Sequence, residues 1–142
     1  MIDLGNILRD IQTHNDICRQ LLEIVQQENR WLSGDPADES REAPDQTLKA
    51  SLSKSLTQVV EKIQVHRASL QDAAEKDPGG NRHPDIQSAI EGATDMIMKI
   101  VVLDRENEKL LMKKGMVPRE KIPSSYQYRP SEALRAYVKS PS

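Results

Sequence analysis

Three segments of the chain repeat large apolar side chains every three or four positions, and this spacing constrains the fold more than any other feature. It runs from Leu4 to Leu32, from Leu48 to Ala73 and from Ile86 to Leu111. It matches the 3.6-residue turn of an α-helix and not the two-residue alternation of a strand. We therefore predict three long amphipathic helices, over residues 3–32, 46–76 and 84–114.

Capping and breaking residues support these bounds. Asp3 is a suitable N-cap, Gly34 follows the first helix, and the run 77–80 (Asp-Pro-Gly-Gly) separates the second helix from the third. Pro84 is favoured in a first helical turn, and Gly115 provides a stop. Because the three helices have similar lengths and narrow apolar stripes, we predict an all-α, up-down-up bundle with packing like that of a coiled coil.

Composition agrees with a helical fold and narrows the function. Only 3% of residues are aromatic, which disfavours a sheet-based core. A net charge of -2 provides no basic field for nucleic acid, and no apolar run is long enough for membrane insertion. The single cysteine rules out an internal disulfide and suits a reducing compartment. We expect a cytoplasmic protein without a signal peptide.

The chain divides into a predicted bundle, residues 1–115, and a tail, residues 116–142. Within the first part, residues 33–45 are acidic and lack large apolar side chains, so we expect a mobile linker there. The tail holds all three tyrosines, and its segment 131–139 has the pattern of a short helix capped by Ser131. So short a helix is marginal alone in water and needs a docking surface. The sequence leaves open whether that surface is its own bundle or a partner.

Candidates for catalysis or metal binding are few. His14 and Cys18 share one helix face, and an up-down pairing of the first two helices places His66 at a similar height. Zinc normally requires four such ligands, so we favour a structural role and predict no metal or cofactor. Nothing would activate Cys18 as a nucleophile, and no phosphate-binding loop is present, so we predict that the protein is not an enzyme.

Charged residues on the predicted helices are interpreted mainly as solvated faces. Lys49 falls outside the apolar stripe of the second helix, and Asp104 lies in a run of alternating charges that is typical of a solvated, ion-paired helix surface. Two polar residues interrupt the stripes, Glu28 and Asn107, and they fall at similar heights. They either fix the register of the helices or mark an end that is open to a ligand. Trp31, beside them, either caps the core or contacts a partner.

The tail provides the other candidates for partner binding. Its tyrosines are interleaved with arginine and proline, a composition typical of interfaces, although a disordered terminus is the alternative interpretation. The predicted partner-binding residues are Tyr126, Tyr128, Leu134, Tyr137, Val138 and Trp31.

Two segments resemble the FlgN-type flagellar export chaperones. Residues 21–32 (LLEIVQQENRWL) are similar to the end of that family's first helix, where a Glu-x-x-x-Leu element precedes a loop. Residues 103–111 (LDRENEKLL) are similar to its last long helix, where an asparagine precedes paired leucines. The chain length, the three-helix order and the tyrosine-bearing tail also match. The proline-rich tail and the acidic linker have no counterpart in the family pattern.

The resemblance implies a flagellar type III secretion chaperone that binds hook–filament junction subunits and delivers them to the export gate. It further implies that the C-terminal region captures the client and that a tail tyrosine, Tyr126 or Tyr128, contacts the gate component. The alternative function is a non-catalytic helical adaptor that acts by self-association, since narrow apolar stripes also permit a homo-oligomer.

Overall fold

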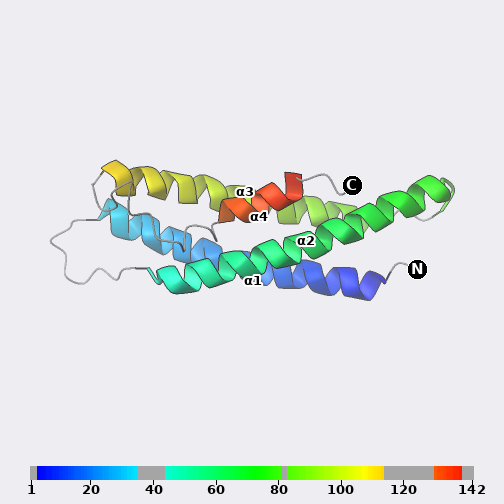
Figure 1. Cartoon of the computed structure of the whole chain (residues 1–142), viewed down its shortest axis with the longest axis horizontal. Helices are drawn as coiled ribbons and strands as arrows, with labels where there is room; N and C mark the ends of the chain where they lie inside the picture. The colour runs from blue at the N-terminus through cyan, green and yellow to red at the C-terminus, as the bar shows by residue number, and fades with distance from the viewer. Residues whose placement is uncertain (1–2, 35–43, 81–82, 114–129, 139–142) are drawn as a thin grey trace.

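The computed structural model describes residues 3–34, 44–80, 83–113 and 130–138. These form four helices: α1 (Leu4–Ser33), α2 (Gln46–Lys76), α3 (Pro84–Lys113) and α4 (Pro130–Val138) (Figure 1). The three long helices run up, down and up, and no strand occurs in the described ranges. The predicted all-α bundle of three long helices is therefore confirmed, and each long helix begins and ends within one residue of its predicted range.

Side-chain caps explain where the helices begin. The Asp3 carboxylate accepts a hydrogen bond from the Asn6 amide at 3.1 Å, and the Asp45 carboxylate accepts one from the Leu48 amide at 2.9 Å. Each bond satisfies an amide that has no partner in the first turn of a helix. The turn after α2 is tight at Gly80, where a Cβ would lie 2.6 Å from a carboxylate oxygen and 3.2 Å from the backbone carbonyl oxygen of Asp77. The predicted cap at Asp3 and the break at residues 77–80 are confirmed.

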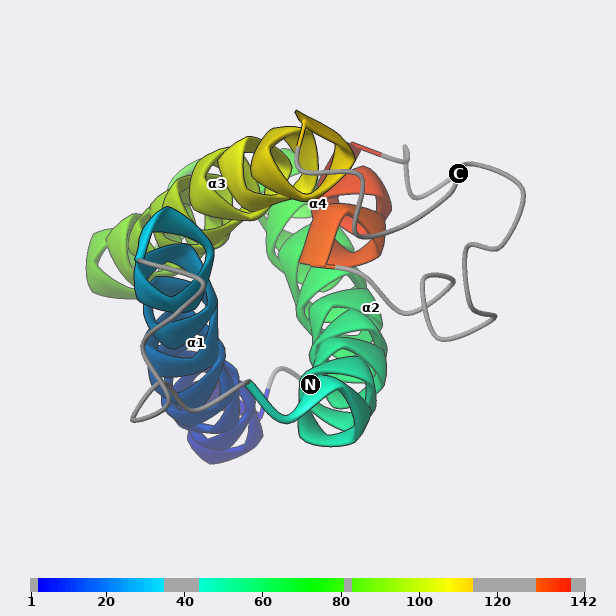
Figure 2. The same ribbon diagram turned by 90° about the vertical axis from the view of Figure 1, so that its left-hand side faces the viewer.

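The core lies along the line where α1 packs against α2 and α3. Figure 2 looks along the bundle and shows α1 facing both other long helices, while α2 and α3 diverge on the opposite side. The aliphatic side chains that α1, α2 and α3 bury most completely are Ile7, Leu21, Val25, Leu32, Leu56, Val60, Ile63, Ile97 and Ile100. Burial of each such side chain contributes about 1.5–3 kcal/mol, so this aliphatic seam stabilises the three long helices.

The short helix α4 fills the gap between α2 and α3. It packs against both of them and runs in the same direction as α2 (Figures 1 and 2). Pro130, Ala133 and Tyr137 are buried, and the last two belong to the same apolar core as the long helices. Within the predicted tail, the segment 130–138 thus docks on the protein's own bundle.

Several predicted features lie outside the described residues. They are residues 35–43 of the predicted linker, and Tyr126 and Tyr128 of the tail. Among the helices that are described, none is both long enough and apolar enough to cross a membrane.

Candidate functional site

The site with the most distinctive geometry is the surface of α2 and α3 that α4 covers, which we call the α4 seat. On its α2 side, the Gln64 side chain is 7% exposed, and its amide donates to the carbonyl oxygens of Tyr137 at 2.7 Å and Ala136 at 3.3 Å. The last carbonyls of a helix lack partners within that helix. Gln64 therefore binds the C-terminal end of α4 by recognising helix backbone, without regard to side-chain identity.

Tyr137 is the main side chain that α4 inserts into the bundle. Its ring is 7% exposed and meets the His14 ring of α1 edge to face, with centroids 6.0 Å apart. Its hydroxyl lies beside Thr94 of α3 but makes no well-formed hydrogen bond, and the Thr94 hydroxyl donates its own proton to the Ile90 carbonyl at 3.1 Å. Burial raises the pKa of Tyr137, so the phenol remains protonated. A buried hydroxyl without a full partner weakens the docking of α4.

His14 and Cys18 form the floor beneath Tyr137. Both are fully buried, and His14 Nδ1 lies 3.1 Å from Asn15 Oδ1 and 3.8 Å from Cys18 Sγ. Burial raises the pKa of Cys18 to about 12, so the thiol is protonated and a poor nucleophile. His66 turns elsewhere, with its Nε2 2.7 Å from Asp10 Oδ2. His66 thus pairs with Asp10, one turn before His14 on α1, and within the described ranges no three histidine, cysteine, aspartate or glutamate side chains gather in a group that could hold a metal.

We expect acidification to weaken the bundle through His14. Burial lowers the pKa of His14 below that of the unfolded chain, because the charged ring would lose its hydration. A lowered folded-state pKa means that the stabilisation is present above about pH 6.5 and is lost as the pH falls below it. Between pH 7.5 and pH 5.5, the free energy of unfolding measured with urea should fall more for the wild type than for His14→Gln. Equal losses in both proteins would contradict this role, because the other titrating groups are common to both.

A buried ionic layer ties the three long helices together near the end of α1. Lys49 of α2 places its ammonium 3.1 Å from Glu28 Oε1 of α1 and 2.5 Å from Asp104 Oδ1 of α3. The side chains of both acids are 3% exposed, and that of Lys49 is 13% exposed. Burial alone would lower the pKa of Lys49, but the attraction of Asp104 and Glu28 outweighs it and the pKa is raised. The ammonium therefore stays charged at neutral pH.

Amide side chains complete this layer. Asn107 donates to Glu28 Oε1 at 3.1 Å and to the Val25 carbonyl at 2.9 Å, and it accepts a bond from Asn29 at 2.8 Å. Gln46 donates to Glu28 Oε2 at 2.6 Å. The predicted common height of Glu28 and Asn107 is confirmed. Their side chains lie in a closed, hydrogen-bonded layer, so the structure favours the role of fixing the helix register over an open ligand site.

Two sequence interpretations in this region are wrong. Lys49 was placed on a solvated face, and Asp104 in a solvated run of charges, yet both lie in the ionic layer. The apolar stripes could not reveal them, because a charged side chain is buried only where another helix supplies its partner. Gln64 was missed for a related reason: its partners are backbone carbonyls of α4, which leave no mark in the pattern of side chains.

The predicted partner-binding residues fall in separate places. Tyr137 is buried in the α4 seat, Leu134 is half-buried beside it, and Val138 is the last residue of α4. Trp31 is half-buried in the last turns of α1. Along α1 it lies 17 residues from His14, the residue that Tyr137 contacts, which is about 25 Å at the rise of an α-helix. Trp31 and Tyr137 therefore do not form one surface.

The described residues form a bundle of three long helices whose open seam is closed by a short fourth helix. Comparison with known proteins gives no match, whether to protein-family models, to curated proteins or to solved structures. The function is therefore argued from the residues of the seam and from the resemblance of residues 21–32 and 103–111.

Proposed function

We propose that this protein is a flagellar type III secretion chaperone that protects hook–filament junction subunits in the cytoplasm and delivers them to the export apparatus. The proposal combines the resemblance of residues 21–32 and 103–111 with one structural observation, the docking of α4 in a seam that α2 and α3 leave open (Figure 2). A seam that accepts one short amphipathic helix has the shape and chemistry to accept another.

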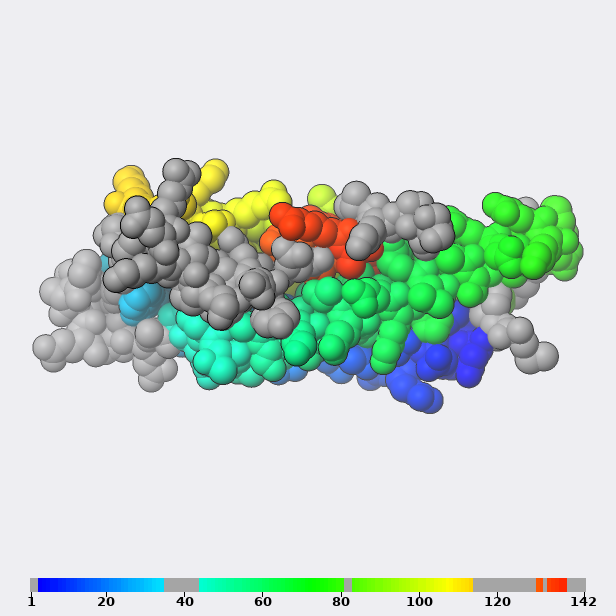
Figure 3. Space-filling view, in the orientation of Figure 1, coloured from blue at the N-terminus to red at the C-terminus, as the bar shows by residue number. Residues whose placement is uncertain are grey.

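The α4 seat suits a client of unspecified sequence. Gln64 binds main-chain carbonyls, and the apolar floor around His14 accepts a large side chain such as Tyr137. In the space-filling view (Figure 3), α4 lies at the surface between α2 and α3, so it can leave without opening the α1 interfaces. On release, α4 exposes the apolar seam and its own apolar face, with Leu134 and Tyr137. A client helix would bind between these two surfaces.

A seam that is already filled limits the affinity for a client. Where the binding-competent state is a small fraction of the molecules, the apparent dissociation constant rises in inverse proportion to that fraction. Modest affinity is useful to a chaperone that must hand over its client. Tyr126 and Tyr128, outside the described residues, are the proposed contacts with the export gate.

The test compares the wild type with Ala133→Arg, a variant designed to release α4, because Ala133 is fully buried in the seat. The ligand is a purified helical terminus of a hook–filament junction subunit, and binding is measured by calorimetry. We expect the variant to bind more tightly than the wild type. Failure of both proteins to bind would refute the flagellar proposal, and equal affinities would show that the client binds away from the α4 seat.

A second candidate function is the self-associating adaptor. Met98 and Val102 lie one turn apart on α3 and are 49% and 65% exposed, so α3 has an apolar pair on its outer face. Light scattering of the purified protein separates the candidates. A stable oligomer that does not bind the junction subunit would favour the adaptor.

A further inference from the structure

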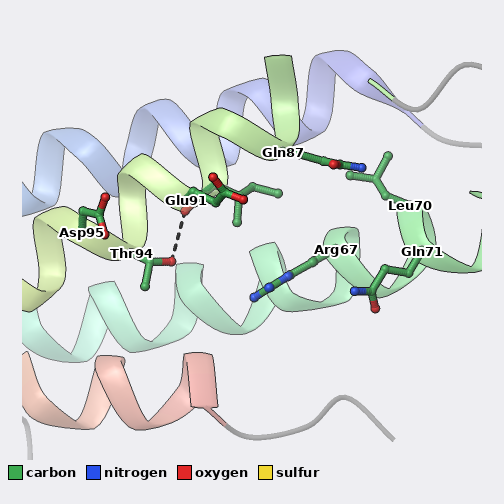
Figure 4. Close-up of a pocket in the computed structure, with 8 residues that line it drawn as sticks. Arg67, Leu70, Gln71, Gln87, Glu91, Thr94 and Asp95 are labelled. Atoms are coloured by element: carbon green, nitrogen blue, oxygen red, sulfur yellow. Dashed lines mark hydrogen bonds between the residues drawn. The ribbon is translucent and has the colours of Figure 1, made fainter. Parts of the chain in front are cut away.

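Beyond the C-terminal end of α4, the same seam continues as an open groove (Figure 4). We call it the distal groove; it has a volume of about 320 Å³ and is lined by α2 and α3. Leu70 from α2 and Ile90 from α3 are buried in its apolar part. This volume lies near the lower end of the range for ligand pockets, about 300–1,000 Å³. The distal groove can therefore hold a few side chains, but not a whole helix.

The distal groove joins the α4 seat directly. Thr94 lines the groove and also lies beside the Tyr137 hydroxyl, and the charge of Arg67, another lining residue, acts on Tyr137. The last turn of α4 therefore ends where the groove begins. A helix whose first turn lies in the distal groove, and which continues along the seam, would overlap the position of α4.

The walls of the distal groove carry opposite charges. Arg67 projects from α2, and Glu91 and Asp95 stand one turn apart on α3 (Figure 4). All three side chains are exposed, and in the described ranges no ion pair is formed by any of them. Two carboxylates against one guanidinium leave the groove with a net negative charge. It is therefore complementary to a ligand that has an apolar face and a basic residue.

We propose that the distal groove is the first contact site for a client helix, whose leading turn binds there while α4 is still docked. The occupant is an amphipathic helix of a partner protein, with an apolar side chain against Leu70 and Ile90 and a lysine or arginine toward Glu91 and Asp95. This inference rests on the proposed function and adds the partner's chemistry and the order of events.

First contact in the distal groove has a kinetic consequence. Once its leading turn is bound, the rest of the client helix is held beside the seam at a high effective concentration. The client helix then replaces α4 in the α4 seat, one helical turn at a time. Exchange of this kind avoids a stage in which the whole apolar seam is exposed to water.

The test uses two synthetic amphipathic peptides with the same apolar face, one with lysines and one with glutamates at the polar positions. Binding to the full-length protein is measured by fluorescence anisotropy at low salt. We expect the wild type to prefer the lysine peptide by about fivefold, which corresponds to about 1 kcal/mol for two exposed ion pairs together. The variant Glu91→Lys/Asp95→Lys should reverse that preference.

A matched control separates the distal groove from overall charge. Glu23→Lys/Glu106→Lys makes the same change in net charge at exposed positions outside the groove, and it should keep the preference for lysine. The same preference in all three proteins, or no peptide binding at all, would overturn the proposal. A change in oligomeric state on Glu91→Lys/Asp95→Lys, seen by light scattering, would instead identify a second copy as the occupant and also overturn it.

The first-contact proposal and the flagellar proposal can fail separately. If Glu91→Lys/Asp95→Lys reverses the peptide preference but the protein does not bind a junction subunit, the distal groove is supported and the flagellar function is refuted. If the wild type and Glu91→Lys/Asp95→Lys bind the junction subunit with the same affinity, the flagellar function is supported and the groove is refuted as first contact site.

Discussion

Replacing Lys49 with methionine is expected to lower the free energy of unfolding by about 3–5 kcal/mol, the usual effect of removing one partner from a buried ion pair. The variant would remove the ammonium that the buried carboxylates of Glu28 and Asp104 share. Methionine has a helix propensity close to that of lysine and a similar length, so the loss would come from the charges. Urea unfolding followed by circular dichroism at pH 7 measures it.

Two further variants isolate the cause. Lys62→Met makes the same change at an exposed position of α2 and should alter stability by less than about 0.5 kcal/mol. The triple variant Glu28→Gln/Lys49→Met/Asp104→Asn should recover much of the loss, because it removes both buried negative charges together with the ammonium. If Lys49→Met were as stable as Lys62→Met, the buried ionic layer would not exist in solution.

Ala133→Arg is expected to detach α4 while leaving α1, α2 and α3 folded. Ala133 is fully buried, and an arginine there would place a large charged side chain in an apolar seat. Burying that charge would cost more than about 2 kcal/mol, so the ratio of undocked to docked molecules should rise by at least about 30-fold. Hydrogen exchange of the α4 amides, followed by mass spectrometry, measures this rise directly.

The control for this experiment is Arg135→Lys, which keeps the positive charge at an exposed position of the same helix. It should leave the protection of the α4 amides within about twofold of the wild type, since surface substitutions rarely change stability by more than about 0.5 kcal/mol. Protection of the α1–α3 amides should persist in both variants. Protected α4 amides in Ala133→Arg would mean that the seat tolerates a large side chain and is not selective.

The ionic layer and the α4 seat divide the bundle into parts of different stability. The layer joins all three long helices through a buried ion triad and the bonds of Asn107. The seat holds a nine-residue helix through one glutamine side chain and the burial of three residues, with the Tyr137 hydroxyl lacking a full partner. The proposed exchange of α4 is thus confined to one seam, and the register of the long helices does not depend on it.

Much of the architecture was predictable from local signals. The apolar spacing, the cap at Asp3 and the break at residues 77–80 predicted the three long helices and their order. These signals are readable in one segment at a time, because helix formation depends on neighbours three and four residues away. The matching heights of Glu28 and Asn107 also followed, since the rise per residue of an α-helix is constant.

The candidate site was only partly predictable. The pattern of residues 131–139 indicated a short helix that needs a docking surface, but it did not determine which surface the helix packs against. That surface depends on the divergence of α2 from α3, which results from the packing of both helices against α1. Gln64, Thr94 and the distal groove come together only through that packing.

The sequence by itself thus determined where the helices lie, which way they run and which faces are apolar. The tertiary structure alone decided that Lys49 and Asp104 are buried as partners, that α4 completes the bundle, and that its seam continues into an open groove. The physical reason is the range of the interactions. Periodicity, capping and breaking act over a few residues, whereas a buried charge or a docked helix is stable only when a distant segment supplies its partner.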